Sequence, residues 1–203
     1  HLEALENTRD LGGFPTVDGR RIKPHRLIRS GELSKITAND IEILKNEYNL
    51  KKIIDLRTDM EMEHKPDPEI EGVEFEHIPF VDTQTVGITY EKNIFATAIA
   101  KVKSMDESAE EYMENMYRAL ITNENSLKNI ARFFEVLLEN EDGAILFHCS
   151  AGKDRVGIVS LLVLLALDVD RDVIIKDYLA TRIFSAKDII LTRIFSIFVL
   201  RNI

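Results

Sequence analysis

Residues 148–155 read His148-Cys149-Ser150-Ala151-Gly152-Lys153-Asp154-Arg155 and lie between two apolar runs. The first run, residues 144–147, is typical of a buried strand, and the second, residues 156–167, of a buried helix. A glycine-containing loop between a strand and a helix directs backbone N–H groups and the positive end of the helix dipole toward one point. The octapeptide therefore predicts a phosphate-binding loop.

Cys149 is the only cysteine of the chain, and it lies six positions before Arg155. The positive field of such a loop favours the thiolate, which is the nucleophilic form of cysteine. Arg155 adds a planar, permanently charged group that matches two phosphate oxygens. We expect Cys149 to attack phosphorus and Arg155 to stabilise the charge that develops on the oxygens. The residues expected to bind phosphate are Ser150, Ala151, Gly152, Lys153, Asp154 and Arg155.

Two other interpretations of this stretch explain it less well, and the first of them fails. A nucleotide-binding loop needs Ser or Thr after the lysine, but Asp154 follows Lys153, and the preceding glycine, Gly143, lies too far upstream. An inert buried cysteine would account for Cys149 alone. It would not account for the glycine, the arginine and the strand–helix frame together.

The string HCSAGKDRVG, residues 148–157, resembles the signature of the cysteine-dependent protein tyrosine phosphatase superfamily. Within it, the string is similar to a bacterial branch with tyrosine and phosphoinositide activity. Three further segments resemble the same branch. Its N-terminal motif corresponds to residues 7–14, its early strand to residues 54–57, and the segment that delivers its general acid to residues 78–82. The resemblance implies a phosphomonoester hydrolase with a cysteinyl-phosphate intermediate. No cluster with metal-ligand spacing is visible in the sequence, so we expect no metal and no other cofactor.

The leaving oxygen needs a proton from the side of the phosphate opposite the thiolate. The resemblance assigns this role to Asp82, which follows a predicted strand and precedes residues 83–85. A turn-forming aspartate is the structural alternative for Asp82. Asp154 lies inside the loop and is the rival acid; we assign it a supporting role.

Five further residues are expected to support the loop. His148 would order it by hydrogen bonding rather than transfer protons. A strand-end Asp55 with Arg57 two residues later, and the pair Arg9-Asp10, can form ion pairs that stabilise the loop holding Cys149. Buried ion pairs also occur without a catalytic role, which is the alternative.

Val156 departs from the superfamily pattern, in which Ser or Thr usually follows the arginine. A hydroxyl at this position can donate a hydrogen bond to the thiolate and ease its departure when water attacks the intermediate. Valine lacks that donor, so we expect slow hydrolysis of the phosphoenzyme. A phosphate-binding pseudophosphatase with slow turnover is the corresponding alternative function.

Charge limits the class of partner. The net charge of −9 argues against nucleic acid and gives no general attraction to anionic membranes. Positive potential must therefore be local, from Lys153 and Arg155, with Arg9, Arg57 and Lys65 as further contributors. The expected substrate is a phosphotyrosine protein. A phosphoinositide or dual-specificity preference is the alternative. Similar loops of phosphoinositide phosphatases carry a lysine at the position of Lys153 and often a second lysine directly after the cysteine, where this chain has Ser150.

The remaining segments predict an α/β fold, a three-layer sandwich in which helices flank a central sheet. Strands are expected over residues 26–29, 52–56 and 73–80, and helices over 37–48, 125–138, 156–167 and 170–178. Ligands of open α/β sheets collect at the carboxyl ends of strands. Asp55, Asp82 and Cys149 all follow or end predicted strands.

At 203 residues, the chain suits one phosphatase domain, residues 1–203, with residues 83–122 as a helical lid or insertion. No apolar stretch reaches the roughly 18 residues of a membrane span. No signal-peptide pattern is visible, and the chain opens with His1 rather than Met. Cytoplasmic and secreted locations therefore both stay open.

Overall fold

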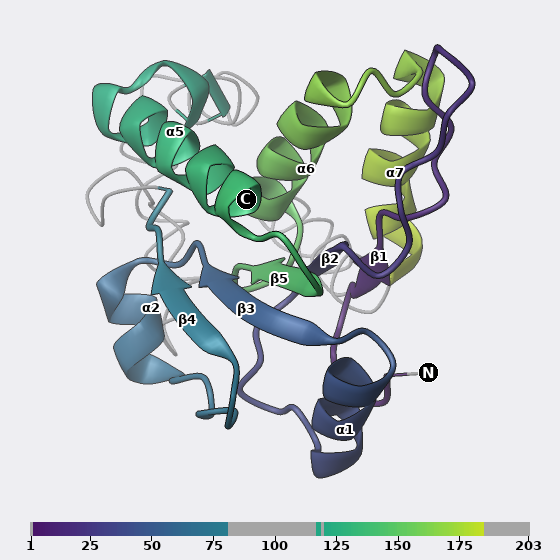
Figure 1. The fold of residues 1–203 in the computed structure, drawn as a ribbon. Helices are drawn as coiled ribbons and strands as arrows, with labels where there is room; N and C mark the ends of the chain where they lie inside the picture. Colours follow the sequence, from purple (N-terminus) through teal and green to yellow (C-terminus); the bar gives the residue numbers. More distant parts are fainter. Residues whose placement is uncertain (1, 81–116, 119, 185–203) are drawn as a thin grey trace, which may run out of the picture.

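The computed structural model describes residues 2–80, 117–118 and 120–184 (Figure 1). Within this part of the chain, one sheet has the strand order β1-β2-β5-β3-β4. Its strands are β1 (Arg9–Asp10), β2 (Leu27–Ser30), β3 (Leu50–Asp55), β4 (Glu74–His77) and β5 (Ala144–His148). β2, β5, β3 and β4 run parallel, and β1 pairs antiparallel with β2. The predicted α/β class is confirmed.

The helices with defined bounds are α1 (Ala38–Asn46), α2 (Asp59–His64), α5 (Glu124–Glu139), α6 (Asp154–Ala166) and α7 (Arg171–Phe184). α5, α6 and α7 lie on one side of the sheet and α1 lies on the other, which gives the expected three layers (Figure 1).

Both faces of the central strands are buried, because successive side chains of a strand point to opposite faces. On β5, Ile145 and Phe147 belong to the core under α5 and α6. Leu146, between them, belongs to a second core that includes Leu44 of α1. A strand covered on both faces needs a continuous apolar sequence, which is what residues 144–147 provide.

The expected cap of the first helix is confirmed, because Thr37 caps α1 through a reciprocal capping box with Asp40.

Several boundaries differ from those predicted. β4 is shorter than residues 73–80, because it ends at His77, ahead of Pro79, which cannot donate to a ladder. α7 continues beyond residue 178 to Phe184. The helix α2 was not predicted, and it contains a residue of the site. The lid assigned to residues 83–122 falls mostly outside the described residues.

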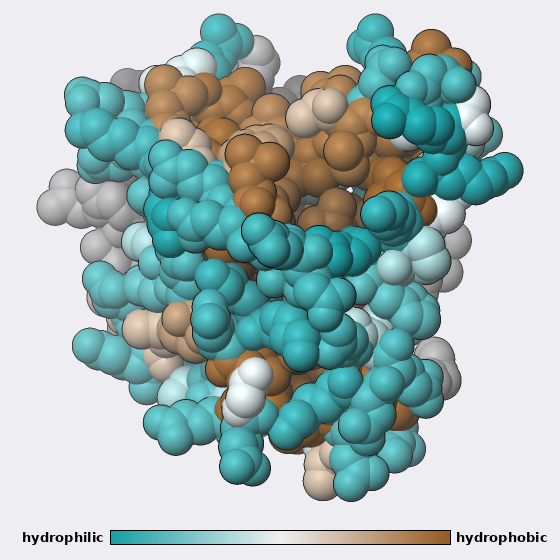
Figure 2. Space-filling model, viewed as in Figure 1, coloured by the Kyte–Doolittle hydropathy of each residue, from teal (hydrophilic) through white to brown (hydrophobic). Residues whose placement is uncertain are grey.

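An apolar hollow of about 580 Å³ lies at the end of the sheet opposite Cys149. Its lining includes Leu27 and Ile145, at the beginnings of their strands, and Leu167, just after α6. Figure 2 shows the apolar surface of this region between α5 and α6. The hollow is therefore separate from the phosphate-binding loop.

Candidate active site

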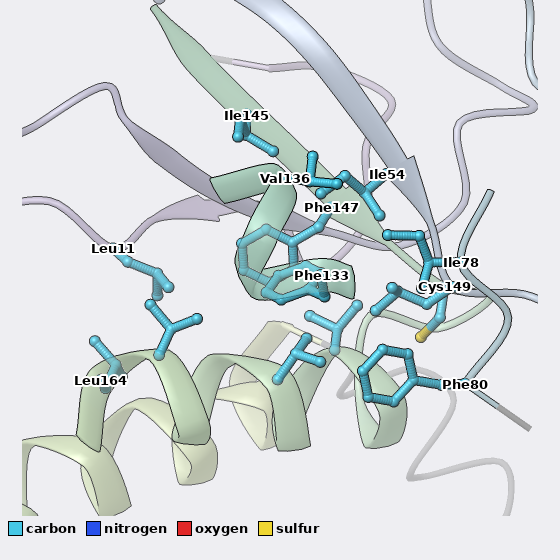
Figure 3. Close-up of a cluster of buried hydrophobic side chains, with 14 of the residues drawn as sticks. Leu11, Ile54, Ile78, Phe80, Phe133, Val136, Ile145, Phe147, Cys149 and Leu164 are labelled. Carbon is cyan, nitrogen blue, oxygen red and sulfur yellow. The ribbon is translucent and has the colours of Figure 1, made fainter. Parts of the chain in front are cut away.

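Residues 148–155 connect the end of β5 to the beginning of α6, as predicted. Cys149 is 2% exposed and lies at the edge of the apolar core, beside Ile78 and Phe80 (Figure 3). Gly152 has a φ of +62°, and a Cβ there would lie 2.7 Å from the backbone of Ser30. Only glycine allows the loop to turn this close to β2.

The carbonyl groups of the loop are bound by neighbouring segments. Asn7 Nδ2 donates to the Gly152 carbonyl at 2.6 Å and to the Ala151 carbonyl at 3.2 Å. Arg29 Nη2 donates to the Gly152 carbonyl at 3.0 Å, and the Glu32 amide donates to the Ser150 carbonyl at 3.1 Å. In a trans peptide the N–H points away from the C=O. The N–H groups that follow these carbonyls therefore face away from the donors, where an anion can accept from them.

A buried ion-pair triad fixes Arg29 in this position. Asp177 on α7 lies 2.5 Å from Arg29 Nη1 through Oδ2 and 2.7 Å from Arg9 Nε through Oδ1. Burial and the charge of Arg9 lower the pKa of Arg29 to about 10, and Asp177 opposes that shift. Arg29 is therefore protonated at neutral pH and can hold the loop carbonyl. Sequence reasoning missed Asn7, Arg29 and Asp177, because no local pattern indicates pairing across most of the chain.

Glu61 on α2 binds Arg155 in a bidentate pair. The distances are 2.6 Å from Nη1 to Oε2 and 2.8 Å from Nη2 to Oε1. Ser150 Oγ donates to Glu61 Oε1 at 2.5 Å and so connects the pair to the loop. Burial opposes ionisation of Glu61, but the hydrogen bonds and charge of Arg155 outweigh it and lower the pKa of Glu61 to about 2. Burial also opposes the charge of Arg155, whose pKa is nevertheless raised by Glu61.

This pair fixes the plane of the Arg155 guanidinium. Longer contacts run from Nη1 to the Leu56 carbonyl at 3.5 Å and from Nη2 to Ser150 Oγ at 3.3 Å. A guanidinium has five N–H donors, so phosphate can accept from Nε or take the place of these longer contacts. Glu61 was not predicted as a site residue. The signal that could have found it is the spacing of Thr58 and Glu61, which form a capping box at the start of α2.

A buried polar cluster behind the loop consists of His148, Asp55, Arg57 and Asp67. Arg57 Nε lies 2.9 Å from Asp55 Oδ1, and Arg57 Nη2 lies 2.9 Å from Asp67 Oδ1. His148 Nε2 lies 2.8 Å from Asp67 Oδ2. Burial opposes ionisation of Asp55, but hydrogen bonds from Arg57 and the charge of His148 lower its pKa. The cluster connects the ends of β3 and β5 directly behind Cys149.

Asp55, Asp67 and His148 offer oxygen and nitrogen atoms within 4.8 Å of one another, a spacing that could hold a metal ion. The Arg57 guanidinium already pairs with both carboxylates. These residues are therefore charge-compensated without a metal, and we assign none to them.

Three cations expected to add positive potential are each paired with a carboxylate. Arg9 pairs with Asp177, Arg57 pairs with Asp55, and Lys65 Nζ lies 2.6 Å from Glu32 Oε1. The Lys153 side chain is 43% exposed, with Nζ 3.9 Å from Asp154 Oδ1. Lys153 is therefore the loop cation that faces solvent.

The remaining predicted residues lie as follows. Asp10 accepts from the amides of Gly12 and His25, both at 2.7 Å, and so stabilises a turn beyond β1. Asp154 is the first residue of α6 and accepts a hydrogen bond from Tyr117. Asp82 lies outside the described residues.

A buried thiol at the end of a parallel strand, followed by a glycine-containing loop and an arginine held by a carboxylate, is the arrangement expected of cysteine-dependent phosphatases, which are phosphoric monoester hydrolases. A family model described as the tyrosine phosphatase family matches residues 1–195. The chain therefore belongs to the tyrosine phosphatase family, as the resemblance of its loop predicted.

Named relatives agree with this assignment. The chain is 29% identical over 193 residues to the triple specificity protein phosphatase PtpB of Mycobacterium tuberculosis, covering 88% of this chain and 67% of the relative. It is 29% identical over 181 residues to a putative tyrosine-protein phosphatase of Cupriavidus necator, covering 88% and 61%. A tyrosine-protein phosphatase of Nostoc commune is 26% identical over 166 residues, covering 81% and 51%. The chain thus spans about half to two thirds of these relatives.

No helix among the described residues is long and apolar enough to cross a membrane.

Proposed function

We propose that this chain hydrolyses phosphotyrosine in proteins through a covalent intermediate on Cys149. The observation that carries the proposal is the loop of residues 149–155, whose carbonyls are bound from outside while Glu61 orients Arg155. This arrangement supports a site in which the thiol, the amide N–H groups and the guanidinium bind one phosphate. It suits the trigonal phosphoryl group of a transfer reaction.

The reaction takes two steps. In the first, the Cys149 thiolate attacks phosphorus, an S–P bond forms and the bond to the leaving oxygen breaks. Asp82 donates a proton to that oxygen, and Asp154 supports proton or water handling from the first turn of α6. In the second, water attacks the phosphocysteine and gives one proton to the Asp82 carboxylate, which restores the acid. The S–P bond breaks, and the thiolate and inorganic phosphate are released.

Hydrolysis of an aryl phosphate tests the proposal directly. We expect steady-state turnover that vanadate inhibits and that a chelator leaves unchanged, because the thiol needs no metal. Acid quenching during turnover, followed by peptide mapping, is expected to find phosphate on Cys149. A chelator-sensitive activity, or turnover with no trapped phosphocysteine and no effect of vanadate, would contradict a thiol mechanism.

The preferred substrate is tested with two substrates at matched concentrations. A phosphotyrosine peptide is expected to give the higher kcat/KM, and a short-chain phosphoinositide the lower. Lys153 faces solvent beside the loop and supplies one extra cation. A dominant lipid activity would favour the phosphoinositide alternative, and Lys153→Ala would then reduce it more than the peptide activity.

Val156→Thr is expected to raise the steady-state rate. Val156 is fully buried and directly follows Arg155 in the first turn of α6, so a hydroxyl placed there lies close to the loop. One hydrogen bond to the departing thiolate corresponds to about a 2- to 10-fold faster breakdown of the intermediate. The measurement is kcat together with the amount of trapped phosphocysteine, which should fall as kcat rises. An unchanged or lower kcat, in a variant with normal thermal stability, would show that hydrolysis of the intermediate does not limit turnover.

A further inference from the structure

Two tyrosines form a hydrogen-bond chain that ends on Asp154. The Tyr117 hydroxyl donates to Asp154 Oδ1, and the Tyr178 hydroxyl lies 3.1 Å from the Tyr117 hydroxyl. Because the Tyr117 hydroxyl donates its proton to Asp154, the Tyr178 hydroxyl is the donor in the hydrogen bond between the two tyrosines. The hydrogen bonds therefore run from Tyr178 through Tyr117 to the Asp154 carboxylate.

The position of Tyr178 is fixed by α7 and by the first turns of α6. Its neighbour Asp177 pairs with Arg9 and Arg29, which places α7 against the segments that bind the loop carbonyls. A Cβ at Gly157 would lie 3.0 Å from Cε2 of Tyr178. The ring of Tyr178 thus occupies the space left by the missing side chain at Gly157, one turn beyond Asp154.

The hydrogen bond from the two tyrosines is made to one oxygen of the Asp154 carboxylate. Tyr117 and Lys153 both approach Oδ1 of this carboxylate, Tyr117 with its hydroxyl and Lys153 with Nζ at 3.9 Å. Burial, with the hydrogen bonds to Asp154 and Tyr178, raises the pKa of Tyr117, so its phenol remains a neutral donor at the pH of the reaction.

We propose that Tyr117 and Tyr178 are positioning residues that hold the Asp154 carboxylate in one orientation for its part in phosphoryl transfer. This inference rests on the proposed function. The inference goes beyond the proposed function because it makes the rate depend on two phenols outside the phosphate-binding loop. The side chain of Asp154 is 34% exposed, and a carboxylate with that much access to solvent has other rotamers available. The tyrosines restrict it to one.

The test combines phenylalanine variants with Asp154→Asn. We expect Tyr117→Phe to lower kcat for an aryl phosphate about 10-fold with little change in KM, since a hydrogen bond to a charged group is lost. Tyr178→Phe should lower kcat about 2- to 3-fold, because it acts through Tyr117. In the Asp154→Asn background, Tyr117→Phe should have no further effect on kcat. An equal loss in both backgrounds would overturn the proposal.

The matched control is Tyr48→Phe, which removes a phenol that packs beside His25, away from the loop. It should leave kcat unchanged. Thermal melting of each variant reports on folding, and a loss of stability with an unchanged kcat would assign Tyr117 a structural role only.

A measurement without turnover separates this inference from the proposed function. Crystal structures of the unmodified chain and of Tyr117→Phe should differ at Asp154, whose side chain is expected to occupy one rotamer when the Tyr117 hydroxyl is present and more than one when it is absent. The same single rotamer in both structures overturns the proposal, whereas absent turnover with changed rotamers overturns only the proposed function.

Discussion

Cys149→Ser is expected to lower the hydrolysis of an aryl phosphate by at least about 10⁴-fold, the scale of loss when a covalent nucleophile is removed. A serine hydroxyl is a much weaker nucleophile than a cysteine thiolate. Cys149 is the only cysteine of the chain, so no other thiol can replace it. The measurement is kcat at saturating substrate. Residual activity of more than a few per cent would mean that another group attacks phosphorus.

Phosphate binding provides the control for Cys149→Ser. In the proposed site, backbone amides and Arg155 bind the anion, and the substitution removes none of them. Calorimetric titration with inorganic phosphate should therefore give a similar Kd for both proteins. A parallel loss of binding would show that the substitution had changed the loop rather than the chemistry.

Glu61→Gln is expected to destabilise the fold by on the order of 3 kcal/mol at pH 7. The pKa of Glu61 falls from 4.5 to about 2 on folding, and each unit corresponds to about 1.4 kcal/mol. Because the folded pKa is the lower one, this stability is present above about pH 4.5 and is lost as the pH falls toward 2. The difference in unfolding free energy between the two proteins should therefore shrink steadily below pH 4.5. Urea unfolding at a series of pH values measures it.

The same substitution should lower kcat by about 10- to 100-fold, the usual loss when a group that orients a functional side chain is removed. Arg155 would keep its charge but lose the carboxylate that fixes its plane. Glu63→Gln is the matched control, since Glu63 is exposed on the same helix. Equal stability of Glu61→Gln and Glu63→Gln at pH 7 would contradict the assigned role of the ion pair.

The sequence predicted the parts of the site that local pattern determines. The apolar runs on both sides of residues 148–155 are sufficient to place Cys149 between a strand and a helix. The residues that hold the loop carry no such signal. Glu61 and Arg155 are 94 positions apart, and Arg29 and Gly152 are 123 positions apart. Local periodicity contains no information on which distant charges will pair, and the only local signal near Glu61 is its three-residue spacing from Thr58, from which α2 was not predicted.

The contacts of the phosphate-binding loop also determine when the site can form during synthesis. Asn7 and Gly152 are separated by 145 positions, and Arg29 and Asp177 by 148. A nascent chain that extends only through α6 contains the whole loop but lacks Asp177. The carboxylate of Asp177 compensates the charge of the buried Arg29, so Arg29 is not stably buried before α7 is made. Contacts of such long range close late, because the entropy of bringing distant segments together must be offset by the rest of the fold. Catalytic competence is thus a property of the finished domain, and activity reports the completion of folding.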